Sequence, residues 1–96
     1  MSEEYVKAII VGLGGRARSW IEVCHRNAEV EIVGYIEPVP EQRQRVADQY
    51  NIQSDQLFDS ISAALDSVSP DFAIDVTPPK VHEPTAIEIF AAGVFT

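Results

Sequence analysis

A turn rich in glycine stands near the start of the chain, directly after a run of apolar residues. Residues 12–17 read GLGGRA, which matches the pattern G-x-G-x-x-G/A with Ala17 in the third place. In such a turn the first glycine permits a tight bend, the second lets a pyrophosphate approach the backbone, and the small third residue lets helix and strand pack closely. The N–H groups that begin the following helix would then face the phosphates. Taken alone, the same residues could also form a strand-to-helix turn that binds no ligand.

An acidic residue occupies the position where the second half of a dinucleotide site is expected. Glu37 comes 20 residues after Ala17, in agreement with the spacing of about 20 residues for a carboxylate that binds the adenosine ribose. The alternative is a solvent-exposed acid at the end of a strand. A carboxylate here would repel a 2′-phosphate, so the sequence favours NAD over NADP. Arg43 and Arg45 lie in the next predicted helix, where we interpret them as surface residues. A role as ligands of a 2′-phosphate stays open as the alternative.

The charge of the chain argues against one large class of partner. Its 96 residues include 15 acidic and 7 basic side chains, which give a formal net charge of −8. Because binding to nucleic acid needs clustered Lys and Arg, we expect no nucleic-acid partner. A chain of this length is expected to form one domain.

The sequence also carries no sign of export or of membrane insertion. No apolar run approaches the roughly 20 residues of a membrane span, and acidic residues stand where a signal peptide would be basic. The single cysteine, Cys24, can form no internal disulfide, which is typical of a reducing compartment. We therefore expect a cytoplasmic protein with no membrane partner.

Predicted strands and helices alternate along the whole chain. β-rich apolar segments predict strands, and segments whose apolar residues recur every three or four positions predict helices. The expected strands cover residues 5–11, 30–36, 57–58, 72–76 and the start of a fifth at 94–96. The expected helices cover residues 16–27 and 40–50, a short segment after Asp59 or Ser60, and residues 83–92. This order predicts an α/β fold with a doubly wound parallel sheet, truncated in the fifth strand.

Apolar spacing in the first two helices predicts which side chains face the sheet. In the first helix, four residues fall at i, i+3, i+4 and i+7: Ala17, Trp20, Ile21 and Cys24. In the second helix, the inner residues are Val46, Ala47 and Tyr50. Asn51 then suits the left-handed position that ends a helix.

The segment DVTPPKVHEPTAIEIFAAG at residues 75–93 makes a family resemblance specific. Its Thr-Pro, the histidine that follows, and the helix that ends in Ala-Gly resemble the Gfo/Idh/MocA (glucose–fructose oxidoreductase / inositol dehydrogenase) family. The sequence VGLGGRA and the pair Glu37-Pro38 are similar to the N-terminal half of proteins of that family. The resemblance implies a Rossmann domain that binds NAD or NADP. It also implies hydride transfer between the nicotinamide and a sugar or polyol.

The same resemblance assigns residues to the cofactor. The pyrophosphate would be held by Gly12, Leu13, Gly14, Gly15, Arg16 and Ala17, with Arg16 facing either the phosphates or solvent. Glu37 would bind the ribose, and four residues would lie along the cofactor toward the nicotinamide: Val76, Thr77, Pro78 and Pro79. His82 matches the family's histidine after Thr-Pro. We interpret it as a hydrogen-bonding residue of the cofactor site rather than as an acid–base catalyst.

The resemblance stops before the family's catalytic motif. Glu-Lys-Pro, with the catalytic lysine, normally follows the fifth strand, and this chain ends at Thr96. We therefore expect residues 1–96 to form an incomplete dinucleotide-binding Rossmann domain that is not catalytic alone. We also expect this chain to associate into a homo-oligomer more readily than a complete domain would. A nucleotide-sensing module without hydride chemistry is the alternative. A methyltransferase dependent on S-adenosylmethionine is less favoured, since Ile9-Ile10-Val11 offers no acid before the glycines.

Overall fold

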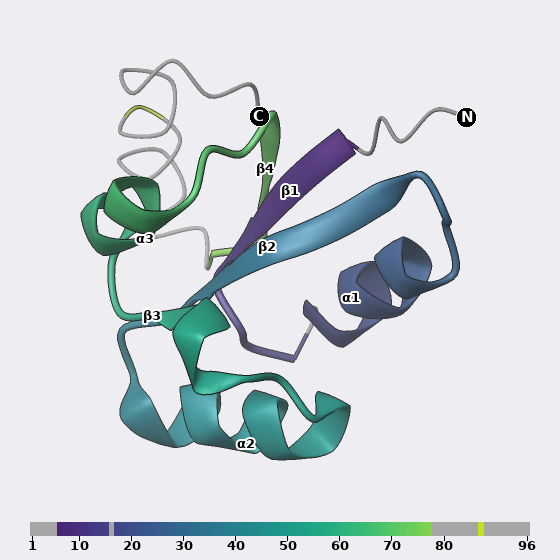
Figure 1. Ribbon diagram of the computed structural model, residues 1–96. Coiled ribbons are helices and arrows are strands. Elements are labelled where there is room, and N and C mark those ends of the chain that lie inside the picture. The colour runs from purple at the N-terminus through teal and green to yellow at the C-terminus, as the bar shows by residue number, and fades with distance from the viewer. Residues whose placement is uncertain (1–5, 16, 78–86, 88–96) are drawn as a thin grey trace.

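The computed structural model describes residues 6–15, 17–77 and 87 (Figure 1). Its strands are β1 (Val6–Val11), β2 (Val30–Ile36), β3 (Leu57–Phe58) and β4 (Phe72–Asp75). Its helices are α1 (Ala17–His25), α2 (Pro40–Tyr50) and α3 (Ile61–Ser67), together with a 3-10 turn, η1 (Ser54–Gln56). The predicted bounds of β2, α2 and β3 are confirmed, whereas η1 was not predicted.

The four strands form one parallel sheet in the order β3-β2-β1-β4. The chain runs outward from β1 to β3 and then crosses back to place β4 on the other side of β1 (Figure 1). This reversal of direction next to β1 is the topology of a doubly wound sheet, and the predicted fold class is confirmed. The register pairs Val11 with both Ile36 and Asp75. The carboxyl ends of β1, β2 and β4 therefore meet at one edge.

Two hydrophobic clusters lie on opposite faces of the sheet. Consecutive residues of β1 alternate between them, because strand side chains point to opposite faces. Ile10 packs with the inner residues of α1 and α2, while Ile9 and Val11 pack with Ile61 and Ala64 of α3. Two predicted helix ends are confirmed. The Ser60 hydroxyl caps α3 by accepting from the amide of Ala63 at 3.1 Å, and Asn51 ends α2 with a φ of 57°. Helix α1 ends at His25, two residues before the predicted end.

Gly34 of β2 lets the short strand β3 lie against the sheet. A Cβ at this position would be 3.2 Å from Ile9 Cγ2 and 3.3 Å from Phe58 Cε2. The space that glycine leaves is therefore filled by the ring of Phe58. This contact helps to explain why a strand of only two residues keeps its place in the sheet.

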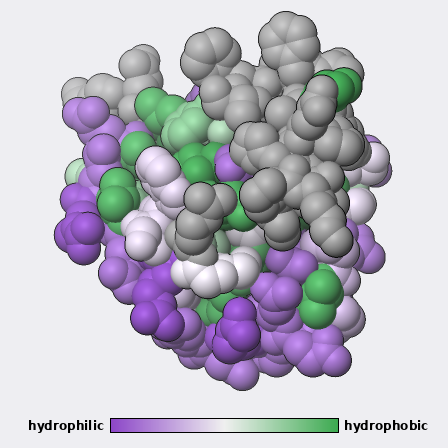
Figure 2. All heavy atoms as spheres, turned by 180° about the vertical axis from the view of Figure 1, so that it is seen from behind, coloured by the Kyte–Doolittle hydropathy of each residue, from purple (hydrophilic) through white to green (hydrophobic). Residues whose placement is uncertain are grey.

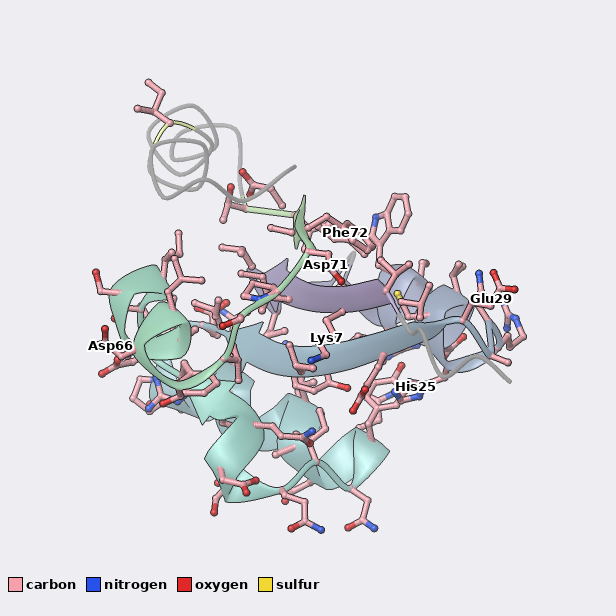
Figure 3. All side chains as sticks on the ribbon, turned by 45° about the horizontal axis from the view of Figure 1, so that its top comes forward. Lys7, His25, Glu29, Asp66, Asp71 and Phe72 are labelled. Atoms are coloured by element: carbon pink, nitrogen blue, oxygen red, sulfur yellow. The ribbon has the colours of Figure 1, made fainter. Side chains whose placement is uncertain are left out.

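The polar surface of the domain agrees with its composition. Figure 2 shows that hydrophilic residues cover most of the lower part of the molecule, where α2 lies in Figure 1. At the amino end of the sheet, Lys7 and Asp71 exchange two hydrogen bonds that join β1 to the segment before β4 (Figure 3). In the described part of the chain, no helix has the length and apolar character needed to cross a bilayer.

One packing prediction for α1 is wrong. Ala17, Ile21 and Cys24 are buried as expected, but Trp20 is 46% exposed. With 3.6 residues per turn, Trp20 lies roughly 60–70° from the centre of the stripe formed by the other three residues, so its ring stays at the border of the contact.

The predicted end of β4 differs from the observed one, and two predicted elements lie almost wholly outside the described residues. β4 ends at Asp75, one residue earlier than expected. The predicted helix at 83–92, apart from the exposed Ile87, and the predicted strand at 94–96 lie outside the described residues.

Tyr35 lies beneath a hollow between the C-terminal ends of α1 and α2. This cavity of about 600 Å³ is lined by Cys24, His25 and Tyr50 as well. The Tyr35 side chain is 4% exposed, and its hydroxyl is 3.4 Å from His25 Nε2. Burial, with a smaller contribution from the nearby Cys24 thiol, raises the pKa of Tyr35 to about 12.

We expect the stability of the domain to fall in alkaline solution through Tyr35. An unfolded tyrosine loses its proton near pH 10, whereas the folded state keeps it up to about pH 12. Between these values the native state binds more protons than the unfolded state. The free energy of unfolding therefore falls as pH rises, by up to about 1.4 kcal/mol per pH unit. Urea unfolding of the wild type and of Tyr35→Phe across this range tests the effect. Equal pH dependence in the two proteins would contradict it.

Candidate functional site

The predicted site residues that the structure describes come together at the carboxyl edge of the sheet. The glycine turn follows β1, Glu37 follows β2, and Thr77 follows β4, so three neighbouring strands each deliver one part. Ligands of open α/β sheets bind in the crevice at this edge, where the strand order reverses. In this fold the strand order reverses between β1 and β4, and the glycine turn follows β1 at that point.

Gly12 brings the end of β1 against the end of β4. Its φ is +94°, a conformation that side chains with a Cβ rarely adopt. A Cβ at Gly12 would lie 3.1 Å from the carbonyl of Val76 and from the nitrogen of Thr77. The Gly12 amide donates to the carbonyl of Ile36 at 2.8 Å. The first glycine of the pattern is therefore required both for the bend and for the close approach of two backbones.

The other two glycines leave space above the start of α1. A Cβ at Gly15 would have nothing within 4 Å, and one at Gly14 would reach only Gln42 Oε1, at 3.6 Å. The Gly14 carbonyl accepts from the amide of Ala17 at 3.0 Å, which opens the helix. This open backbone at a helix N-terminus fits a pyrophosphate group. Arg16 lies outside the described residues.

Leu13 and Ala17 anchor the turn in the core. Leu13 is fully buried and Ala17 is 1% exposed, and both pack in the cluster on the side of α1 and α2. The Leu13 side chain therefore faces away from the crevice, and only its backbone is directed to the site. Ala17 has the small side chain that close packing of helix on strand requires.

Glu37 is buried, and its carboxylate joins two segments of the site. Oε1 accepts from the amide of Leu13 at 2.8 Å, and Oε2 accepts from the amide of Val39 at 3.0 Å. The residue is only 6% exposed, so the interpretation of Glu37 as a solvent-exposed acid is wrong. Two backbone donors offset part of the cost of burying a charge. Because each carboxylate oxygen has a second lone pair, Glu37 can still accept from ribose hydroxyls.

Arg43 is a site neighbour that the fingerprint did not predict. Its Nη1 donates to the main-chain carbonyl of Glu37 at 2.7 Å, and the residue is half-buried. Arg43 is therefore only partly exposed and contacts the Glu37 main chain, whereas Arg45 is exposed as expected. No fingerprint position corresponds to Arg43. The signal was the short distance in sequence between Glu37 and the helix that begins at Pro40.

The end of β4 supplies the third wall. The Val76 amide donates to the carbonyl of Val11 at 2.9 Å, and both Val76 and Thr77 are buried. The Thr77 hydroxyl and amide donate to Asp75 Oδ1 at 2.6 and 3.1 Å. These bonds turn the chain sharply at the point where it touches Gly12. The remaining predicted site residues, Pro78, Pro79 and His82, lie outside the described residues.

A comparison with family models decides the identity of this arrangement. The model of the Gfo/Idh/MocA family, described as "Oxidoreductase family, NAD-binding Rossmann fold", matches residues 6–95. The chain belongs to the Gfo/Idh/MocA family. The resemblance seen in the sequence, the Rossmann fold and NAD as the cofactor are thereby confirmed. A comparison with curated proteins finds no match.

Solved structures of Gfo/Idh/MocA and other NAD-binding proteins share the fold. The WlbA dehydrogenase from Bordetella pertussis, in complex with NADH and UDP-GlcNAcA, has a TM-score of 0.83 and 24% identity over 95% of this chain and 27% of its own. An NAD-binding protein from Listeria innocua has a TM-score of 0.78 and 25% identity over 96% and 26%. Apo scyllo-inositol dehydrogenase from Lactobacillus casei has a TM-score of 0.79 and 17% identity over 98% of this chain and 28% of its own. The chain thus spans about a quarter of the length of the structures it matches.

Proposed function

We propose that the chain is the cofactor-binding part of an oxidoreductase that transfers a hydride between NAD and a sugar or polyol. The observation that carries the proposal is the 2.8 Å bond from the Leu13 amide to Glu37. This bond joins the two halves of the dinucleotide fingerprint, which are 24 residues apart in sequence, at the edge where such folds bind ligands.

Each part of the site has a proposed role toward NAD. The pyrophosphate lies over the backbone of Gly14 and Gly15 at the start of α1, and Arg16 is a further proposed ligand of the phosphates. Glu37 accepts hydrogen bonds from the ribose hydroxyls of the adenosine. Val76, Thr77, Pro78 and Pro79 are assigned to the nicotinamide side of the cofactor. His82 belongs to the same proposal as a hydrogen-bonding residue.

The geometry supports NAD over NADP. The Glu37 carboxylate is fixed by two amides, so it cannot easily rotate away from an incoming 2′-phosphate. Arg43 on α2 donates to the Glu37 carbonyl. A 2′-phosphate would therefore meet a fixed negative charge.

The proposed substrate class rests on the family and on two of the neighbours. WlbA was crystallised with a nucleotide sugar, and another neighbour is a scyllo-inositol dehydrogenase. Both UDP-GlcNAcA and scyllo-inositol carry secondary hydroxyl groups, whose carbon atoms are suitable hydride donors to a nicotinamide. When bound, NAD supplies the hydride acceptor, and the residues described here bind and orient its adenosine and pyrophosphate.

Calorimetric titration of the 96-residue chain tests the proposal. We expect NAD to bind at least about tenfold more tightly than NADP, a difference of about 1.4 kcal/mol, and S-adenosylmethionine not to bind. Circular dichroism establishes that the protein is folded. Tighter binding of S-adenosylmethionine, or no binding of NAD by the folded chain, would overturn the proposal.

A further inference from the structure

The first turn of α2 is the part of the site with no role so far. Gln42 Oε1 lies 3.6 Å from the position of a Cβ on Gly14, so this turn lies beside the glycine turn. The next residue, Arg43, donates from Nη1 to the Glu37 carbonyl at 2.7 Å. The first turn of α2 thus lies beside both halves of the dinucleotide fingerprint: Gln42 is near the glycine turn, and Arg43 is bonded to Glu37.

The segment that carries Glu37 has few hydrogen-bond donors of its own. Two of the next three residues, Pro38 and Pro40, have no N–H. The Val39 amide is used by the Glu37 carboxylate, and the Glu37 amide donates to the carbonyl of Phe58. The Glu37 carbonyl accepts from Arg43. The orientation of the peptide that follows Glu37 therefore depends on a side chain from α2.

That peptide and the carboxylate belong to the same residue. If the Cα–C bond of Glu37 changes direction, the Cα–Cβ bond changes direction too, since both bonds share the tetrahedral Cα, and the carboxylate then moves relative to the Leu13 amide. A charge-assisted bond from a guanidinium is well suited to prevent this, because it is shorter and stronger than a neutral bond. Val39 strengthens the connection, since its carbonyl accepts from the amides of Gln42 and Arg43 and so begins α2 beside Glu37.

We propose that Arg43 is a positioning residue of the dinucleotide site, which holds the Glu37 main chain so that the carboxylate faces the ribose. This inference rests on the proposed function. Arg43 acts through Glu37, because one of its N–H groups donates to the Glu37 carbonyl. In this role it supports binding of NAD by holding Glu37 and does not itself bind the dinucleotide.

The experiment compares Arg43→Ala with Arg45→Ala, which removes the same charge from an exposed position of α2. We expect Arg43→Ala to weaken NAD about fivefold or more, and Arg45→Ala to leave the affinity unchanged. Arg43→Lys should recover part of the affinity, because an ammonium can also donate to a carbonyl. Thermal unfolding of each variant shows that it is folded at the temperature of the titration.

Two further measurements separate positioning from direct contact and from a general structural effect. In a Glu37→Ala background, Arg43→Ala should add little to the loss of NAD affinity, because the residue that it positions is gone. In the ligand-free protein, hydrogen exchange at the Leu13 amide should be faster in Arg43→Ala than in Arg45→Ala.

Three results would overturn the role of Arg43. They are equal NAD affinity of the two single variants, additive losses in the Glu37→Ala background, and a loss of NADP affinity that exceeds the loss of NAD affinity. The third result would identify Arg43 as a phosphate ligand. If the unmodified chain binds no NAD, the proposed function fails first, and the exchange rate of the Leu13 amide then reports whether Arg43 still holds Glu37.

Discussion

Replacement of Gly12 with alanine should lower the free energy of unfolding by about 2–5 kcal/mol. Two costs combine in this value. The backbone has a φ of +94°, which is strained for a residue with a side chain, and the new Cβ would lie 3.1 Å from backbone atoms of Val76 and Thr77. Backbone atoms at the end of a paired strand cannot move aside as the tip of a flexible side chain can. Urea or guanidinium unfolding measures the loss directly.

Gly15→Ala is the matched control, because it makes the same chemical change three residues later. A Cβ at Gly15 has nothing within 4 Å. We expect its stability to stay within about 0.5 kcal/mol of the wild type, as is usual for exposed sites. If Gly12→Ala were no more harmful than Gly15→Ala, the close approach of β1 and β4 at this point would be wrong. For a domain of this size, a loss of several kcal/mol is a large part of the total stability.

Replacement of Glu37 with alanine should weaken both the fold and the binding of NAD. The buried Leu13 amide would lose its acceptor, which costs about 1–3 kcal/mol of stability. Loss of the bonds to the ribose hydroxyls should weaken NAD about tenfold to a hundredfold. The preference for NAD over NADP should fall, because the charge that repels a 2′-phosphate is removed. Chemical unfolding and calorimetric titration measure the two effects separately.

Glu37→Gln and Glu41→Ala complete this test. Glutamine keeps one oxygen for the Leu13 amide, so more of the stability should remain than in Glu37→Ala. Glu41 is an exposed acid in the first turn of α2, and Glu41→Ala removes the same charge while leaving the Glu37 carboxylate in place. An unchanged ratio of NAD to NADP affinity in Glu37→Ala would contradict the assignment to the ribose. An unchanged stability would contradict the role of the carboxylate in holding the turn.

Local signals explain why most elements were predicted from the sequence. β2 and α2 have the predicted bounds because Pro38 and Pro40 mark the boundary between them and Asn51 marks the end of the helix. The stripe on α1 was predicted too broadly, since apolar character at i+3 includes Trp20, and only packing shows which side chains the sheet covers. The turn η1 has no strong local pattern and was not predicted.

The sequence by itself determined the order of strands and helices, the glycine turn and the acid at the end of β2. These features follow from local chemistry: apolar periodicity, the conformational freedom of glycine and the missing N–H of proline. Only the tertiary structure showed that Gly12 touches Val76 and Thr77, and that Arg43 holds the Glu37 carbonyl. It also showed that Glu37 is buried against the Leu13 amide rather than free in solvent. These contacts depend on how parallel strands align at one edge and where a helix begins beside them, and no local pattern encodes that geometry.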